Sequence, residues 1–135
     1  MENTFKIFTD GGSRGNPGPS GAGGVIMKND VIIAEISEFL NFQTNNYAEY
    51  TALLLTLKRA VELGIKNVEV FMDSKLIVEQ MNGNYKVKNA NLKIKFDEIK
   101  LLKFDNITYN FIYRKFNKIA DKLANKAMDN GLKKN

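Results

Sequence analysis

The sequence contains neither cysteine nor histidine, and these two absences exclude many common enzyme chemistries. Disulfides and thiol nucleophiles need cysteine, imidazole general bases need histidine, and the usual zinc sites are built from these two residue types. An enzyme with this sequence must therefore use carboxylates, lysines, hydroxyl groups or a metal ion held by oxygen atoms.

Long apolar runs and the pattern of an export signal are also missing. No run approaches the roughly 18 apolar residues that cross a membrane. The first ten residues, MENTFKIFTD, lack a charged leader followed by an apolar stretch. We therefore expect a protein that acts in the cytoplasm and does not enter a membrane.

What remains is the composition of an ordinary globular protein. A chain of 135 residues has a common size for one domain, and 44% hydrophobic with 26% charged residues is typical of a packed core. We expect a single domain over residues 1–135, with a flexible tail at 130–135, that is a monomer.

The charge is unevenly distributed. The net charge is +5, and lysines are dense in residues 86–103 and 114–126. On charge alone, an anionic partner such as nucleic acid and a generic basic protein are both open interpretations. A basic chain that also carries four acids unexplained by packing favours a polyanion delivered to metal ions.

The hydrophobic periodicities predict five strands and four helices. The strands are expected at 4–9, 22–28, 31–39, 67–72 and 107–113, and the helices at 45–63, 75–81, 90–103 and 118–129. Asn29-Asp30 marks a hairpin turn, and Gly64 ends the first helix. The order βββαβααβα predicts an α/β fold in which a mixed five-stranded sheet has three antiparallel strands, then parallel additions, with helices on its faces.

Four acids lie at the ends of these predicted elements. Asp10 and Asp73 end strands, where open α/β sheets place ligand groups, and Glu49 and Asp121 lie near the starts of helices. Each has an ordinary explanation: an Asx turn for Asp10, N-capping for Asp73, a capping box with Asn46 for Glu49, and the helix dipole for Asp121. These explanations give no reason for four acids to face one point.

Four converging carboxylates would repel one another, and a hard divalent cation removes that repulsion. Mg²⁺ takes oxygen ligands and is often completed by substrate phosphate oxygens. Two such ions, roughly 3.5–4 Å apart, can activate a water and stabilise the leaving oxygen of a phosphodiester. We therefore expect two Mg²⁺ ions with substrate bound, and Mn²⁺ as a substitute.

A glycine-rich segment spans residues 10–24 and holds seven of the ten glycines and both prolines. Neither the Walker nor the dinucleotide-binding pattern fits it. Two interpretations remain open: a structured turn with no ligand, or a loop whose backbone approaches a sugar-phosphate chain closely.

Four segments of the chain resemble, in order, the motifs of type 1 ribonuclease H. They are FTDGGSRGNPGPSGAGGVI, TNNYAEY, MDSKLIVEQMNG and the final R-x-x-N-x-x-A-D-x-L-A-N, and they cover most of residues 5–128. The resemblance implies a ribonuclease H-like fold. It also implies a metal-dependent endonuclease that cuts the RNA strand of an RNA/DNA hybrid, leaves 3′-hydroxyl and 5′-phosphate ends, and serves DNA replication.

By motif position, Asp10, Glu49, Asp73 and Asp121 resemble the family's catalytic, metal-binding carboxylates. The residues that resemble contacts to the minor groove and the 2′-hydroxyls are Gly11, Gly12, Ser13, Asn16, Asn45 and Asn46, together with Glu49. Thr44 and Asn89 resemble a pocket for a phosphate of the DNA strand, and Lys75 resembles a further substrate contact.

The chain departs from the family pattern in two loops. Many members carry a histidine before the last acid; here residues 113–116 are Tyr-Arg-Lys-Phe. Two consequences are open: a slower turnover, or an Arg114 that shares the role of that histidine. Some members have a tryptophan-bearing basic protrusion, but this chain has no tryptophan and only the shorter NGNYKVKN at 82–89. We expect Tyr85, Lys86 and Lys88 to supply stacking and phosphate contacts there.

Two other functions remain open for the same fold. One is a nucleic-acid-binding module with weak catalysis, against which the four acids argue, because a pure binder gains nothing from negative charge facing phosphate. The other is a nuclease that prefers double-stranded RNA. A small-molecule enzyme or a structural protein would leave the two basic stretches unexplained.

Overall fold

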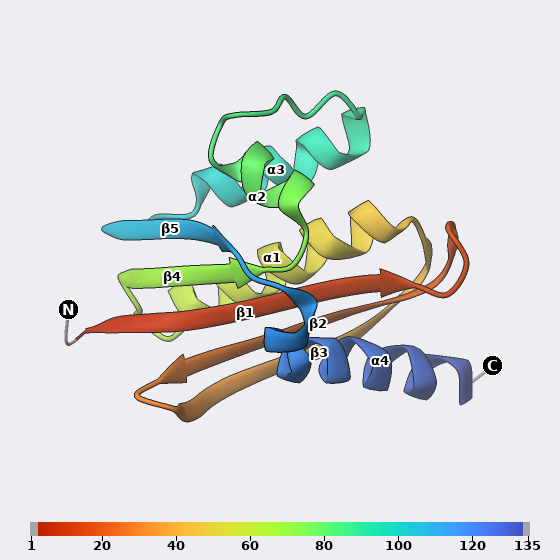
Figure 1. Cartoon of the computed structure of the whole chain (residues 1–135), viewed down its shortest axis with the longest axis horizontal. Coiled ribbons are helices and arrows are strands. Elements are labelled where there is room, and N and C mark those ends of the chain that lie inside the picture. Colours follow the sequence, from red (N-terminus) through yellow and green to blue (C-terminus); the bar gives the residue numbers. More distant parts are fainter. Residues whose placement is uncertain (1–2, 134–135) are drawn as a thin grey trace.

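A computed structural model describes residues 3–133 as a five-stranded mixed sheet with helices on both faces (Figure 1). The strands are β1 (Thr4–Ser13), β2 (Gly18–Lys28), β3 (Val31–Gln43), β4 (Asn67–Met72) and β5 (Asn106–Phe111). The helices are α1 (Asn45–Glu62), α2 (Lys75–Met81), α3 (Ala90–Leu101), the short 3-10 helix η1 (Arg114–Phe116) and α4 (Lys118–Lys133). The predicted order of strands and α-helices is confirmed. Within residues 3–133, none of the helices combines the length and apolarity that a membrane crossing requires.

The strands lie in the order β3-β2-β1-β4-β5, which places β1 at the centre. β1 pairs antiparallel with β2 and β2 antiparallel with β3, whereas β1 with β4 and β4 with β5 are parallel. This is the predicted mixed arrangement. The central position of β1 explains why its sequence is apolar on both faces.

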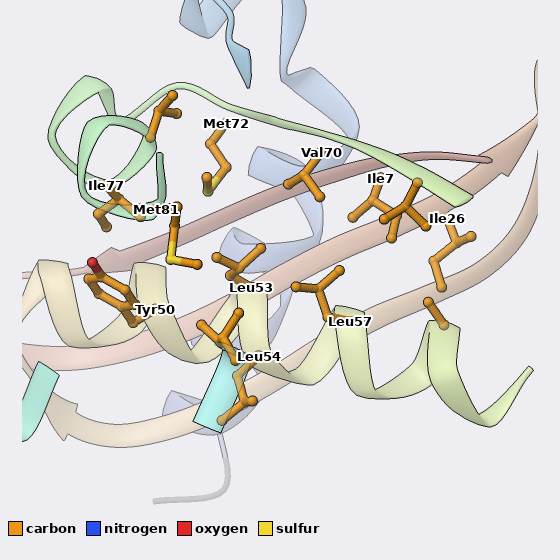
Figure 2. Packing of buried hydrophobic residues seen from close by; sticks show 14 of the residues in the cluster. Ile7, Ile26, Tyr50, Leu53, Leu54, Leu57, Val70, Met72, Ile77 and Met81 are labelled. Atoms are coloured by element: carbon orange, nitrogen blue, oxygen red, sulfur yellow. The ribbon is translucent and has the colours of Figure 1, made fainter. Parts of the chain in front are cut away.

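The main core lies between α1 and one face of the sheet. Figure 2 shows Leu53 and Leu57 of α1 packed toward Ile7 of β1 and Val70 of β4. All four of these side chains are fully buried. Helix α3 packs on α1, and α4 packs on the opposite face over β1, β2 and β3 (Figure 1). The sheet therefore holds α1 and α4 on opposite sides of β1.

The residues predicted to form turns have the backbone conformations that their residue types favour. Asn29 and Asp30 have φ angles of 50° and 64°, which makes the tight turn between β2 and β3 that was predicted. Gly64 follows α1 with a φ of 76°, in the left-handed region that favours glycine. The predicted end of α1 is thus correct to within one residue.

The glycine-rich segment 10–24 forms most of a β-hairpin, so the predicted bounds of the first two strands, 4–9 and 22–28, were too short. β1 continues to Ser13 and β2 begins at Gly18, so only residues 14–17 connect the two strands. Asp10 consequently lies inside β1 and not at its end. Glycine carries no side chain to show the alternation by which strands are recognised in a sequence, and this hid the extension.

Several other elements are longer or shorter than predicted. β3 runs to Gln43, α3 ends at Leu101 and β5 ends at Phe111. α4 continues to Lys133, beyond the predicted helix end at residue 129, and Gly131 is buried against the Phe39 ring. The last two residues of the tail predicted for 130–135 lie outside the described residues.

Candidate active site

Three carboxylates from separate elements meet at one place. One oxygen each of Asp10 in β1, Glu49 in α1 and Asp73 after β4 lie within 4.8 Å of one another. Asp121 of α4 is not part of that group, but it lines the same cavity of about 390 Å³ as the other three. The structure thus brings the four predicted acids to one cavity between α1 and α4.

The ordinary explanations for Asp10 and Asp73 do not hold. Asp10 is paired with Gly23 across the β1–β2 ladder and makes no turn. Asp73 does not cap α2, because the N-cap is Ser74, whose hydroxyl accepts a hydrogen bond from the Ile77 amide at 3.3 Å. Neither carboxylate is needed for local structure, so both are available for a ligand.

Glu49 does not belong to a capping box with Asn46. The N-cap of α1 is Thr44, whose hydroxyl accepts a hydrogen bond from the Tyr47 amide at 3.2 Å. The Glu49 Oε1 atom instead accepts a hydrogen bond from the backbone N–H of Gly11 at 2.8 Å. This bond orients the Glu49 side chain toward β1. For Asp121, in the first turn of α4, the helix-dipole explanation still applies.

The glycines of the hairpin let two helices approach the sheet closely. A Cβ atom on Gly11 would overlap the backbone of Ala48 and Glu49 in α1. On β2, Cβ atoms on Gly21 and Gly23 would overlap the backbone of α4. These glycines therefore bring α1 and α4 close enough to the sheet for their acids to reach the cavity, a function that neither sequence interpretation included.

We predict that Gly11→Ala lowers the free energy of unfolding by about 1–3 kcal/mol, the usual cost of overpacking. The added methyl group has no space against the α1 backbone and must push the helix away from β1. Gly12→Ala is the matched control, because a Cβ there meets only the flexible end of Met128 at 3.4 Å. Urea denaturation of both variants measures the difference, and equal stabilities would contradict the close approach of α1.

Burial and mutual repulsion oppose ionisation of these acids. Burial, together with the charges of Asp73 and Asp121, raises the pKa of Asp10 to about 7. Burial and the neighbouring Asp10 likewise hold the pKa of Glu49 well above its usual range. A divalent cation would compensate the repulsion, and an all-oxygen donor set is what Mg²⁺ and Mn²⁺ take. The residues present therefore fit a divalent metal site.

Arg114 adds a positive charge at the rim of this cavity. Its Nη2 atom lies 3.6 Å from the Asp121 Oδ1 atom, and its side chain is 81% exposed. An ion pair this exposed is weak, so the guanidinium is free to move to another anion. Gly12, Ser13 and Asn45, which were predicted to contact the minor groove, line the same cavity.

The hairpin tip and the start of α1 form one connected surface. The backbone N–H of Ser13 donates a hydrogen bond to the Asn45 Oδ1 atom at 3.0 Å. The backbone N–H of Asn45 donates one to the Asn16 Oδ1 atom, also at 3.0 Å. The segments around 13–16 and 45–46, about thirty residues apart in the sequence, are thereby held in a fixed relation.

A second cavity, of about 460 Å³, lies beside this surface. Its lining includes Asn16, Thr44, Asn46 and Asn89. Thr44 and Asn89 are the N-caps of α1 and α3, so two helix N-termini lie close to the cavity. The structure thus brings together the pair that was predicted to form a phosphate pocket.

The three lysines predicted to contact the substrate are not among the residues that line the two cavities. Lys75, Lys86 and Lys88 are exposed, and they line neither of the two. The loop that carries Lys86 is anchored, because its backbone carbonyl accepts a hydrogen bond from the Gln80 Nε2 atom at 3.2 Å. The contacts expected of these lysines therefore stay predictions.

Two asparagines at the acids were not identified as site residues from the sequence. The Asn125 Nδ2 atom donates hydrogen bonds to the Asp121 carbonyl at 3.0 Å and to its carboxylate at 3.4 Å. The Asn117 Nδ2 atom lies 3.1 Å from the Asp73 carboxylate. The i, i+4 spacing could have revealed Asn125, but Asn117 and Asp73 are separated by 44 residues and meet only in the fold.

Comparison of the sequence with known proteins places it in a defined group. A sequence model described as reverse transcriptase-like matches residues 8–127. A bifunctional protein of Mycobacterium tuberculosis is 46% identical over 127 residues, which are 91% of this chain and 35% of that protein. Ribonuclease HI of Halobacterium salinarum is 37% identical over 125 residues, 90% of this chain and 63% of the relative. The chain thus spans less than two thirds of the length of either relative.

Solved structures share the fold closely. The N-terminal RNase H domain of the M. tuberculosis protein superposes with a TM-score of 0.90 at 43% identity, covering 93% of this chain and 98% of that one. A ribonuclease H1 isolated from compost, solved in complex with an RNA/DNA hybrid, gives a TM-score of 0.89 at 43% identity. That match covers 95% of this chain and 99% of the other.

Proposed function

This chain belongs to the type 1 ribonuclease H family, and we propose that it is a metal-dependent endonuclease that cuts the RNA strand of RNA/DNA hybrids. The observation that carries the proposal is the meeting of Asp10, Glu49 and Asp73 within 4.8 Å, in a cavity that Asp121 also lines. A relative at 43% identity that was solved with a hybrid supports the substrate class. We further propose that the protein acts as a monomer in the cytoplasm, in support of DNA replication.

We place the metal ions, Mg²⁺ or in its place Mn²⁺, among these four carboxylates. Two bound ions would supply an activated water and would stabilise negative charge on the leaving 3′-oxygen of the phosphodiester. The Glu49 carboxylate is oriented by a hydrogen bond from the backbone N–H of Gly11. The Asp73 carboxylate is oriented by a hydrogen bond from the side-chain amide of Asn117. Addition of water at phosphorus with cleavage of the bond to the 3′-oxygen leaves 3′-hydroxyl and 5′-phosphate ends.

The substrate would lie across the two cavities. We propose that the surface formed by Ser13, Asn16 and Asn45 follows the minor groove of the hybrid, where 2′-hydroxyls are exposed. Thr44 and Asn89 would receive a phosphate of the DNA strand, because helix N-termini attract anions. In this arrangement the protein contacts the 2′-hydroxyls of the RNA strand and holds the DNA strand through its phosphate backbone.

Parallel cleavage assays with labelled RNA/DNA hybrid, RNA duplex and DNA duplex test this function. Each is run with Mg²⁺ and with Mn²⁺, and the ends are mapped. We expect efficient cleavage of the hybrid alone, with 3′-hydroxyl and 5′-phosphate products. Faster cleavage of the RNA duplex would show a nuclease for double-stranded RNA, and tight binding without cleavage would show a binding module.

We predict that Lys86→Ala combined with Lys88→Ala weakens hybrid binding and flattens its salt dependence. Removal of one lysine–phosphate interaction reduces the slope of log affinity against log salt by about 0.9, so removal of two reduces it by about 1.8. Cleavage at saturating substrate should change little. Fluorescence anisotropy between 50 and 200 mM salt, about the range in which such interactions are felt, measures the slope.

The control for this pair is Lys28→Ala combined with Lys66→Ala. These two lysines lie together at the opposite end of the sheet, near the start of β4, and their replacement removes the same net charge. An unchanged slope in the Lys86/Lys88 variant, or an equal change in the control, would place the hybrid elsewhere on the surface.

A further inference from the structure

Asn117, between η1 and α4, is a buried polar residue whose side chain contacts one of the four acids. It is 1% exposed. Its Nδ2 atom donates one hydrogen bond to the backbone carbonyl of Thr9 at 2.9 Å and another to the Asp73 Oδ2 atom at 3.1 Å. A single side-chain amide therefore joins β1, one residue before Asp10, to the carboxylate that follows β4.

The backbone of Asn117 makes a third connection. Its carbonyl accepts a hydrogen bond from the Asp121 amide at 3.1 Å, in the first turn of α4. Asn117 is thus bonded to two of the four acids and to the residue that precedes a third. Among the described residues, no other residue of the segment 113–117 forms hydrogen bonds to Thr9, Asp73 and Asp121 together.

The orientation of the Asn117 side chain is determined by its partners. The Thr9 carbonyl can only accept a hydrogen bond, and the Asp73 Oδ2 atom lies beside the same nitrogen, so the amide nitrogen faces both oxygens. The Oδ1 atom is then buried, and within residues 3–133 it has no hydrogen-bond partner. A buried acceptor without a partner destabilises the folded state. The side chain therefore serves its two acceptors at a cost to the stability of the core.

An amide is well suited to hold a carboxylate that must also bind a cation. A lysine or arginine in the same place would orient Asp73 but would also neutralise it and compete with a metal ion. The Asn117 amide donates a hydrogen bond without a net charge, so it restrains the rotation of the carboxylate and leaves its negative charge available.

We propose that Asn117 is a positioning residue that fixes the Asp73 carboxylate relative to Asp10 and so sets the geometry at which a divalent cation binds. The proposal rests on the metal-dependent function proposed above. It assigns Asn117 no contact with the metal or the substrate. Its side-chain amide acts by tying the Asp73 carboxylate to the Thr9 carbonyl of β1, and removal of the amide should allow that carboxylate to turn away from its neighbours.

The test compares Asn117→Leu and Asn117→Ala with the wild-type protein in the absence of nucleic acid. Mg²⁺ is titrated while the backbone amide signals of Gly11 and Gly12, beside the acids, are followed by NMR. Loss of a group that orients a ligand typically weakens metal binding by about 10–100-fold, and we expect a shift of that size. In cleavage assays kcat should fall at a given Mg²⁺ concentration, while KM for the hybrid stays within about twofold of wild type.

Asn110→Leu is the matched control. The Asn110 Nδ2 atom also donates a hydrogen bond to a β4 carbonyl, that of Val70 at 3.1 Å, but within residues 3–133 no hydrogen bond joins it to any of the four acids. We expect its Mg²⁺ affinity to equal that of the wild type. Thermal unfolding of each variant establishes whether it is folded. If Asn117→Leu does not fold, Asn117→Ala is used for the test.

The outcomes separate this inference from the function on which it rests. If the wild type binds Mg²⁺ at the acids and a folded Asn117 variant binds it equally well, the positioning role is wrong and the metal site stands. If Asn110→Leu weakens binding as much as Asn117→Leu, the effect is general destabilisation and the positioning role is again wrong. If the wild type shows no Mg²⁺ binding there, with or without hybrid, both proposals fail.

Discussion

Asp10→Asn is expected to reduce cleavage of the hybrid by about a thousandfold or more, which corresponds to about 4 kcal/mol of lost transition-state stabilisation. The replacement keeps the size of the side chain and removes the charge that would hold a metal ion. Asp73→Asn should have a similar effect, because both carboxylates belong to the group within 4.8 Å. Single-turnover cleavage at saturating Mg²⁺ measures the loss.

The same replacement is expected to stabilise the metal-free protein at neutral and higher pH. The pKa of Asp10 is raised from 3.8 to about 7 in the folded protein by burial and by the charges of Asp73 and Asp121. Between these two values the folded state retains a proton that the unfolded state has lost, so stability falls as the pH rises from about 4 to about 7. Asp10→Asn removes this loss, which is on the order of 4 kcal/mol at pH 8.

Thermal unfolding of both proteins from pH 5 to pH 8, with EDTA, checks this expectation. The wild type should lose stability over that range while the variant changes less, and Mg²⁺ should restore the wild type more than the variant. Asp30→Asn, in the β2–β3 turn, is the control for loss of one negative charge. Wild-type cleavage by Asp10→Asn would refute the assignment of the metal site, and a lower stability at pH 8 would refute the repulsion.

The fold was predictable where the pattern of polar and apolar side chains, or a turn-forming residue type, indicates one local structure. The alternation of residues 107–113 and the Asn29-Asp30 turn have direct physical meaning, and the structure confirms a strand and a tight turn at these places. The glycine-rich segment was not predictable in this way, because glycine shows no alternation and permits either a loop or a strand. Its function in packing α1 and α4 against the sheet depends on residues far away in the sequence, such as Ala48, which no local pattern reveals.

The four acids of the candidate site were predictable from the sequence, but the residues that hold these acids in position were not. Asp73 stood out because it ends an apolar strand, whereas the capping of α2 by Ser74 in its place is seen only in the structure. The capping box assigned to Glu49 was wrong by position, since α1 begins one residue after Thr44 and places Glu49 beyond the first turn. Asn117 stood in the motif that carries the family resemblance, but its role was not predictable, because its two acceptors lie 108 and 44 residues away in the sequence.

The last prediction concerns how the protein distinguishes RNA from DNA. The hairpin tip and the start of α1 are joined by the Ser13–Asn45 and Asn45–Asn16 hydrogen bonds. In both asparagines the amide oxygen is engaged, which leaves the Nδ2 group as a donor for a 2′-hydroxyl. A surface of this extent, running from the acidic cavity to the Thr44–Asn89 cavity, is expected to contact several consecutive sugars.

A single 2′-deoxy substitution moved stepwise through the RNA strand should therefore suppress cleavage sharply at a few positions around it. Each unpaired donor left at the site costs about 1–3 kcal/mol, and two such losses amount to a few orders of magnitude at about 1.4 kcal/mol per tenfold.

The variant Asn45→Ala provides the internal comparison, because it removes one donor from the protein while leaving the four acids in place. If Asn45 reads a particular sugar, the deoxy substitution at that sugar should have little further effect in the variant, whereas substitutions at the other positions should keep theirs. Uniform cleavage of every substituted hybrid by the wild type would mean that duplex shape alone selects the substrate. Sharp losses that are unchanged by Asn45→Ala would mean that other groups on this surface read the sugars, and that Asn45 serves only to hold Ser13 and the hairpin tip in position.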